Sequence, residues 1–251
     1  PELSVGVFRP RFHLQQVMAE AEVVAILNRI MKRGSQGILL KARNTALIRG
    51  AVDRVVAAGI PVVTLATDIP DTGRCAYVGL DNANAGRTAA YLIGTVLPEG
   101  GTVLTSRSQD SFYGESERLQ AFAAALGSNC KCIDLSGGAG LSFDTRGQLE
   151  QVVAQGHQIS AVYSMGGGNA AILAALDHYG HGAIPFVAHD LDAENRKLLE
   201  SGRISFVLHH DLTMDMRNAF HAFARHHRLM APVLHAGPSD IQVVTPFNLP
   251  S

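Results

Sequence analysis

Asp190 is the residue whose position most clearly suggests ligand chemistry. It stands just beyond a short apolar run, after His189, and a carboxylate there is costly unless it is exposed and paired. A carboxylate accepts two adjacent hydrogen bonds, which is what neighbouring sugar hydroxyls donate. Arg118 is a forked donor suited to ring and hydroxyl oxygens. We expect both to line a sugar site; the structural alternative is that they pair with each other or with neighbours.

Other polar or bulky residues also follow apolar runs, where the carboxyl ends of parallel strands would bring them together around a ligand. These further candidates are Lys41, Arg43, Phe112, Tyr113, Met165, Asn169 and His210. The sequence contains no G-x-S-x-G elbow, no H-E-x-x-H helix and no P-loop. It therefore predicts a binding site without a catalytic centre and without a cofactor.

A glycine turn at residues 166–171 offers a different hypothesis. Its sequence, GGGNAA, fits the G-x-G-x-x-A dinucleotide fingerprint, with Asp190 about 20 residues further on. The turn occurs late in the chain rather than at the start of a domain, which favours a turn lining another ligand or a purely structural turn. A nucleotide-dependent α/β enzyme remains an alternative.

Histidine and cysteine do not form a metal motif. His209 and His210 are adjacent, and successive strand residues point to opposite faces, so the two imidazoles cannot easily share one metal. One of them is expected to bond the ligand or to serve a structural role. The cysteines are few and odd in number, which predicts free thiols and no metal site; they are Cys75, Cys130 and Cys132.

The candidates are positioned by short β-branched runs that alternate with amphipathic segments of helical length. The predicted strands are 3–8, 37–40, 61–66, 102–106, 130–135, 160–164, 184–188, 204–208 and 241–245. The predicted helices are 15–32, 45–58, 84–97, 115–126, 145–155, 169–179, 192–201 and 211–227. This alternation predicts an α/β fold with parallel sheets covered on both faces. The irregular stretch 67–79, after which the pattern restarts, favours two Rossmann-like lobes.

Composition limits the partners and the location. The 251 residues carry 21 basic and 22 acidic side chains and no basic cluster, so this segment is not expected to grip DNA by itself. No apolar stretch reaches the roughly 20 residues that a membrane span needs. The N-terminus lacks the regions of a signal peptide. These features predict a cytoplasmic protein that does not interact with membranes.

Several motifs together resemble the effector-binding part of lactose-repressor (LacI) family transcription regulators. The matching segments are GIPVVT at 59–64, YVGLDN at 77–82, AGRTAAYL at 85–92, the helix 115–122 around Arg118, VAHD at 187–190 and LHHD at 208–211. Two departures concern the ligand: Ala121-Phe122 replaces the usual Gly-Phe, and His210 stands where Gln is common.

The resemblance implies a type I periplasmic-binding-protein fold, with lobes of residues 1–80 plus 211–237 and 81–208 plus 238–251, and crossovers near Asp81, His209 and Pro238. It implies effector contacts at Arg118, Asn169, Asp190, His210 and Asp81. It also implies a homodimer that binds DNA through a helix-turn-helix headpiece absent from these residues, as is a first βα unit, so that the sequence is a processed or partial chain. A sugar-transporter solute-binding protein is the alternative within this fold.

Overall fold

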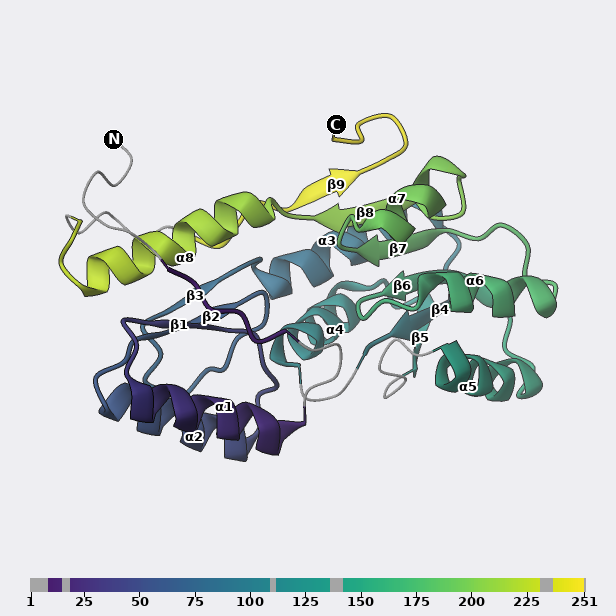
Figure 1. The fold of residues 1–251 in the computed structure, drawn as a ribbon. Coiled ribbons are helices and arrows are strands. Elements are labelled where there is room, and N and C mark those ends of the chain that lie inside the picture. The colour runs from purple at the N-terminus through teal and green to yellow at the C-terminus, as the bar shows by residue number, and fades with distance from the viewer. Residues whose placement is uncertain (1–8, 15–18, 109–111, 136–141, 231–236, 251) are drawn as a thin grey trace. The chain divides into compact units, whose positions relative to one another are not determined.

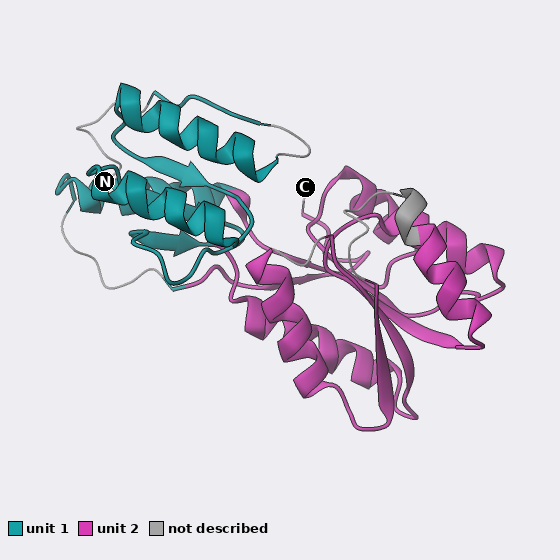
Figure 2. Cartoon of the chain, turned by 90° about the horizontal axis from the view of Figure 1, so that it is seen from below, with its two compact units in different colours: residues 1–78, 213–237 teal, residues 79–212, 238–251 magenta. Residues whose placement is uncertain are grey.

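The computed structural model describes residues 9–14, 19–108, 112–135, 142–230 and 237–250. The strand predicted at 3–8 lies outside the described residues. The chain divides into two compact units, each built from two segments (Figure 2). Unit 1 comprises Pro1–Val78 and Thr213–Gly237, and unit 2 comprises Gly79–Leu212 and Pro238–Ser251.

Unit 1 is a parallel sheet covered by helices on both faces (Figure 1). Its strands are β1 (Ile38–Leu40), β2 (Val62–Leu65) and β3 (Ala76–Val78), in the order β1-β2-β3. Val62 packs with residues of α1 (Glu20–Arg33) and α2 (Ala46–Ala57), whereas Val63 packs with α8 (Leu212–His226). Because successive strand residues point to opposite faces, two adjacent valines serve two layers.

Unit 2 has a larger sheet with the strand order β5-β4-β6-β7-β8-β9. The strands are β4 (Gly101–Ser106), β5 (Cys130–Leu135), β6 (Ile159–Ser164), β7 (Phe186–His189), β8 (Phe206–His209) and β9 (Gln242–Val244). β4 to β8 are parallel to one another, and β9 pairs with β8 in the antiparallel sense.

Five helices cover the two faces of this sheet. They are α3 (Asn82–Val96), α4 (Tyr113–Ala125), α5 (Ser142–Ala154), α6 (Asn169–His178) and α7 (Ala193–Glu200). The side chains of α3 and α4 pack with Tyr163 on one face. Those of α5, α6 and α7 pack with Val162 on the other. Each unit therefore buries its own core.

The predicted α/β class with parallel sheets is confirmed. One detail differs: residues 67–79 were expected to be irregular, but Ala76–Val78 form β3, paired with β2. A strand of three residues is too short to show a hydrophobic period, so only its pairing partner reveals it. The final strand lies close to its predicted position but runs antiparallel to β8.

Candidate functional site

The strand order of unit 2 reverses at β4. The chain passes from β4 to β5 on one side and then returns to β6 on the other side of β4. In open α/β sheets, ligands bind beyond the carboxyl ends of the strands at such a reversal. Gly166, after β6, allows the two loops to meet here, because a Cβ on it would lie 2.0 Å from the Ser108 backbone nitrogen. Gly166 is therefore needed for the packing of these loops.

Two further glycines bring Arg118 into this region. A Cβ on Gly86 of α3 would lie 2.2 Å from the Arg118 carbonyl oxygen, and a Cβ on Gly114 would lie 3.0 Å from the Asn82 amide. The close contact of α3 with α4 buries Arg118, which is 6% exposed. Arg118 Nε donates to Asn82 Oδ1 at 2.8 Å, its only hydrogen bond within the described part of the chain. Both terminal nitrogens of the guanidinium thus retain donors for a ligand.

A buried tyrosine–histidine pair lies beside Arg118. Tyr163 Oη and His189 Nε2 are 2.8 Å apart, and the Tyr163 ring packs against Phe122 with centroids 4.6 Å apart. Burial, followed by the charges of Arg118 and His210, lowers the pKa of His189 well below its usual value. Burial raises the pKa of Tyr163. Both groups are therefore neutral at neutral pH and add no charge to the site.

Two asparagines connect β6 to β7 beyond their ends. Asn169 opens α6 and donates from Nδ2 to Asn195 Oδ1 at 2.6 Å. Asn195 Nδ2 donates to the carbonyl oxygens of His189 at 2.9 Å and Asp190 at 2.7 Å. Both asparagines are buried.

Buried polar atoms at these strand ends lack partners. Ser164 Oγ, Asn169 Oδ1 and His189 Nδ1 form no hydrogen bond to any residue that the structure describes. Buried polar atoms in native proteins are nearly always hydrogen-bonded, and an unmatched one costs about 1–3 kcal/mol. This group of atoms makes the ends of β6 and β7, beside the reversal, the candidate site for a polar ligand.

The predicted residues Asp190 and His210 lie together at the next strand ends. The Asp190 side chain is 61% exposed, and its Oδ1 lies 3.7 Å from Nε2 of the buried His210. Asp190 has a backbone φ of 64°, an uncommon conformation for a residue with a Cβ. His209 stabilises the loop after β7, because its Nδ1 accepts a hydrogen bond from the Leu191 backbone N–H at 3.2 Å.

The other predicted residues occupy different surroundings. Met165 is buried in the hydrophobic cluster of α3 and α4. Phe112 and Tyr113, half-buried, begin α4. Asp81 is the N-cap of α3 and accepts from the Asn84 backbone N–H at 2.8 Å.

Lys41 and Arg43 follow β1 in unit 1, where Lys41 is exposed and Arg43 half-buried. Asn82 and Asn195 were missed by sequence reasoning. A polar residue on the buried side of a helix was the available signal for both.

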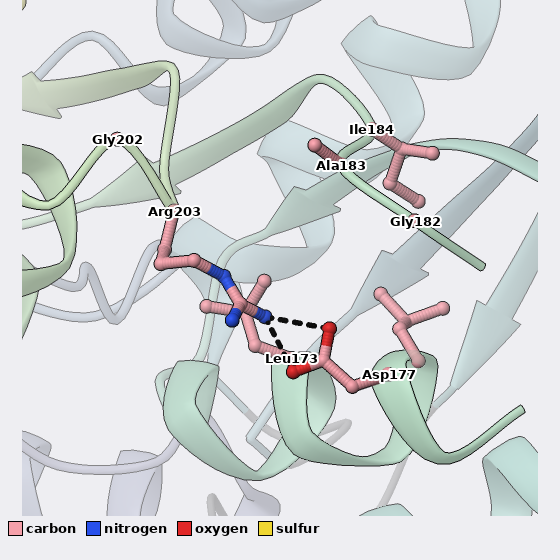
Figure 3. Close-up of a pocket in the computed structure, with 8 residues that line it drawn as sticks. Leu173, Asp177, Gly182, Ala183, Ile184, Gly202 and Arg203 are labelled. Carbon is pink, nitrogen blue, oxygen red and sulfur yellow. Dashed lines mark hydrogen bonds and ion pairs between the residues drawn. The ribbon is translucent and has the colours of Figure 1, made fainter. Parts of the chain in front are cut away.

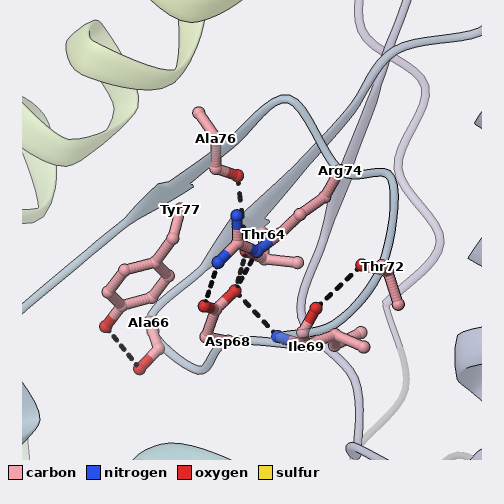
Figure 4. Close-up of polar contacts among 8 residues, drawn as sticks. All are labelled: Thr64, Ala66, Asp68, Ile69, Thr72, Arg74, Ala76 and Tyr77. Carbon is pink, nitrogen blue, oxygen red and sulfur yellow. Dashed lines mark hydrogen bonds and ion pairs between the residues drawn. The ribbon is translucent and has the colours of Figure 1, made fainter.

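Unit 1 carries its own polar cluster after β2 (Figure 4). Thr64 Oγ1 donates to Asp68 Oδ1 at 2.7 Å, and the Ile69 backbone N–H donates to the same oxygen at 2.8 Å. Arg74 donates from Nε to Asp68 Oδ1 and from Nη2 to Asp68 Oδ2. These groups satisfy one another, so the cluster fixes the loop between β2 and β3.

A small hollow of about 190 Å³ lies at the opposite end of the unit 2 sheet, before β7 and β8 (Figure 3). Across it, Arg203 Nη2 bonds both carboxylate oxygens of Asp177 at 2.8 and 2.9 Å. Its charged groups neutralise one another, which makes it a poor candidate for a ligand site.

Within the described part of the chain, no group of three or more His, Cys, Asp or Glu residues is arranged to hold a metal ion. No described helix is both long enough and apolar enough to span a membrane.

Residues 15–226 match the sequence profile of a family described as periplasmic binding protein domain. The chain belongs to this family. Comparison with curated proteins gave no match. The family match confirms the predicted type I periplasmic-binding-protein fold and the prediction that the protein is not an enzyme.

Solved structures of binding proteins share the fold. GanP, a glucose-galactose binding protein from Geobacillus stearothermophilus, is 18% identical with a TM-score of 0.82, over 92% of this chain and 84% of GanP. A solute-binding protein from Burkholderia graminis in complex with D-arabinose is 22% identical with a TM-score of 0.80, over 92% and 82%. A sugar-binding protein of a Bacillus halodurans ABC transporter is 23% identical with a TM-score of 0.75, over 92% and 84%.

The prediction of a LacI-type transcriptional regulator is wrong. The family match is to periplasmic binding proteins, and the similar structures named above are a glucose-galactose binding protein and two ABC-transporter binding proteins. The motifs behind the resemblance lie in or next to β2, β3, α3, α4, β7 and β8, which belong to the fold of the ligand-binding region and carry no information about DNA. The expected DNA partner, homodimer and cytoplasmic location gain no support from these matches.

Proposed function

We propose that this chain is the solute-binding component of a sugar transporter and that unit 2 binds a monosaccharide beyond the carboxyl ends of β6, β7 and β8. The observation that carries the proposal is the group of buried polar atoms at the ends of β6 and β7 that have no partner among the described residues. Each such atom regains its lost hydrogen bond when a hydroxylated ligand arrives.

The mixture of donors and acceptors suits a sugar. Arg118 offers two guanidinium nitrogens, Asn169 Oδ1 offers an acceptor, and the exposed Asp190 carboxylate offers two more acceptors. A sugar hydroxyl both donates and accepts, so one small ligand can satisfy all three residues. The opposite charges of Arg118 and Asp190 balance, and His189 is neutral, which favours an uncharged ligand.

The similar structures support the ligand class. GanP is named as a glucose-galactose binding protein, the Burkholderia graminis protein holds D-arabinose, and an Agrobacterium vitis protein holds D-fucose. A neutral pentose or hexose is therefore the ligand to test first. In this role the macromolecular partner is the transporter, and the place of action is the outer side of the cytoplasmic membrane.

The test is a calorimetric titration of neutral pentoses and hexoses, after a thermal-shift screen. At a ligand concentration of 100 Kd, binding stabilises the folded state by about 2.7 kcal/mol, which a melting curve detects readily. Asp190→Ala is expected to abolish binding and leave the fold intact.

The matched control is Asp177→Ala, which removes an exposed carboxylate at the opposite end of the same sheet. It should bind with wild-type affinity. Failure of every sugar to bind the wild type, or full affinity in Asp190→Ala, would contradict the proposal.

A further inference from the structure

Asn195 is a buried residue that contacts both Asn169 and the backbone of Asp190. It is 3% exposed and lies in the first turn of α7. Asp192, the N-cap of that helix, accepts from the Asn195 backbone N–H at 2.7 Å. This hydrogen bond fixes the position of the Asn195 backbone and therefore the point from which its side chain extends.

The orientation of the Asn195 amide is determined by its neighbours. Two carbonyl oxygens, those of His189 and Asp190, lie at 2.9 and 2.7 Å from one end of the amide. Carbonyl oxygens only accept hydrogen bonds, so the amino group must be at that end. The carbonyl end, Oδ1, therefore faces Asn169 at 2.6 Å.

This orientation fixes Asn169 in turn. An oxygen on Asn195 requires a donor opposite it, so the Asn169 amino group faces Asn195. The remaining end of the Asn169 amide is its oxygen, which is buried and has no partner among the described residues. The strand end thus presents an acceptor, and it does so because of a residue 26 positions away.

We propose that Asn195 is a positioning residue that sets the hydrogen-bond polarity of the sugar site. It makes Asn169 an obligate acceptor, so the ligand group at that point must be a hydroxyl that donates. Through its bonds to the carbonyls of His189 and Asp190, it also holds Asp190 in its left-handed conformation, with φ of 64°. This inference rests on the proposed function.

Because Asn169 Oδ1 only accepts hydrogen bonds, the sugar group that faces it must donate one. Replacing the facing hydroxyl by fluorine preserves most of its size and some acceptor strength but removes the donor. A fluorosugar modified at that position should bind the wild type at least tenfold more weakly than the parent sugar. We call the loss of affinity caused by fluorination at one position of the sugar the fluorine penalty at that position. In Asn169→Ala, this penalty should disappear at the hydroxyl that faces residue 169 and remain at the other hydroxyls. The variant therefore identifies the facing hydroxyl.

The decisive variant is Asn195→Leu, which keeps the branching of the side chain at Cγ and removes every hydrogen bond of the amide. With its partner gone, the Asn169 amide can turn its amino group toward the ligand. We expect the fluorine penalty at the assigned position to fall from at least tenfold to about twofold or less, while penalties at the other hydroxyls stay within twofold of wild type. If Asn195→Leu does not fold, Asn195→Asp, which retains an acceptor for Asn169, should keep the penalty at that position.

The matched control is Leu199→Ala in the same helix. Leu199 is fully buried in the core below α7. This variant removes apolar contacts of α7 and none of the hydrogen bonds of the asparagines, so it should lower stability and keep the whole pattern of fluorine penalties. A uniform loss of affinity for all sugars in Asn195→Leu, or the same altered pattern in Leu199→Ala, would overturn the positioning role.

A second measurement separates this inference from the proposed function. In the unliganded protein, the side-chain amide protons of Asn169 should exchange slowly with solvent, and those of Asn169 in Asn195→Leu should exchange at least tenfold faster. If the wild type binds no sugar but shows this difference, the proposed function fails and the orientation of Asn169 by Asn195 stands. If the exchange rates are equal, the positioning role is wrong.

Discussion

Two clusters of polar side chains follow central strands of the two units, and they differ in how completely they are satisfied. After β2, Asp68 receives hydrogen bonds from Thr64, Ile69 and Arg74. After β6, the hydroxyl of Ser164 has no partner among the described residues. Both β2 and β6 are interior strands of their sheets. The first cluster is nevertheless closed, with its groups bonded to one another, whereas the second is open. Both clusters are polar. What distinguishes the cluster that holds a loop from the candidate binding site is whether its polar groups are all hydrogen-bonded within the protein.

The strongest test of this comparison removes Asp68. Asp68→Ala leaves Arg74 without its carboxylate, and breaking a largely buried ion pair in this way should cost about 3 kcal/mol of unfolding free energy. Urea denaturation measures the loss. Asp177→Ala, which breaks an exposed pair, should cost less than about 1 kcal/mol. Similar losses in the two variants would remove the distinction between a buried clamp and a surface pair.

In the open cluster the larger effect should be on affinity. Arg118→Lys keeps the charge but loses the planar fork, so sugar affinity should fall by about 1–3 kcal/mol, the range for hydrogen bonds to charged groups. Because Arg118 is buried and bonds Asn82, a stability loss of about 1 kcal/mol should accompany it. Calorimetry measures the affinity, and Arg203→Lys at the opposite end of the sheet is the control. Unchanged affinity would exclude Arg118 from the site.

The neutral pair in the open cluster should make stability depend on pH. The pKa of His189 is lowered in the folded state, so the unfolded state binds the proton more readily. Stability is therefore fully present above about pH 6.5 and is lost as the pH falls below it, by at most about 1.4 kcal/mol per pH unit for one group. Burial also lowers the pKa of His209, which adds in the same direction.

His189→Gln retains a hydrogen-bonding group for Tyr163 and removes this titration. Urea denaturation between pH 7 and pH 5 should therefore give a shallower slope for this variant than for the wild type. Equal slopes would mean that His189 does not hold a neutral, buried position.

The smallest effect concerns Asp81, which the sequence resemblance assigned to the ligand and which caps α3. Loss of an N-cap costs about 1 kcal/mol of stability, so Asp81→Ala should destabilise by that amount and leave affinity within twofold. Thermal denaturation and calorimetry provide the two readings. A large loss of affinity would show that Asp81 contacts the sugar.

The sequence by itself determined which residues stand at the carboxyl ends of strands. Alternating apolar runs and amphipathic segments predicted the α/β class, and the position after each run selected Asn169 and Asp190. These features are local, since they depend on the period of a strand or helix and on the residue that ends it. The same motifs misdirected the function to a DNA-binding regulator, because they belong to the ligand-binding fold alone.

Only the tertiary structure decided which of these polar groups are satisfied. Asn169 meets Asn195 and Tyr163 meets His189 across 26 residues, and Arg118 meets Asn82 across 36. Such contacts are set by strand order and by the close approach of helices at Gly86, not by any local pattern. A hydrogen bond depends on separations of tenths of an ångström between residues distant in sequence. The chain order alone therefore cannot tell the closed cluster at Asp68 from the open one at Asn169.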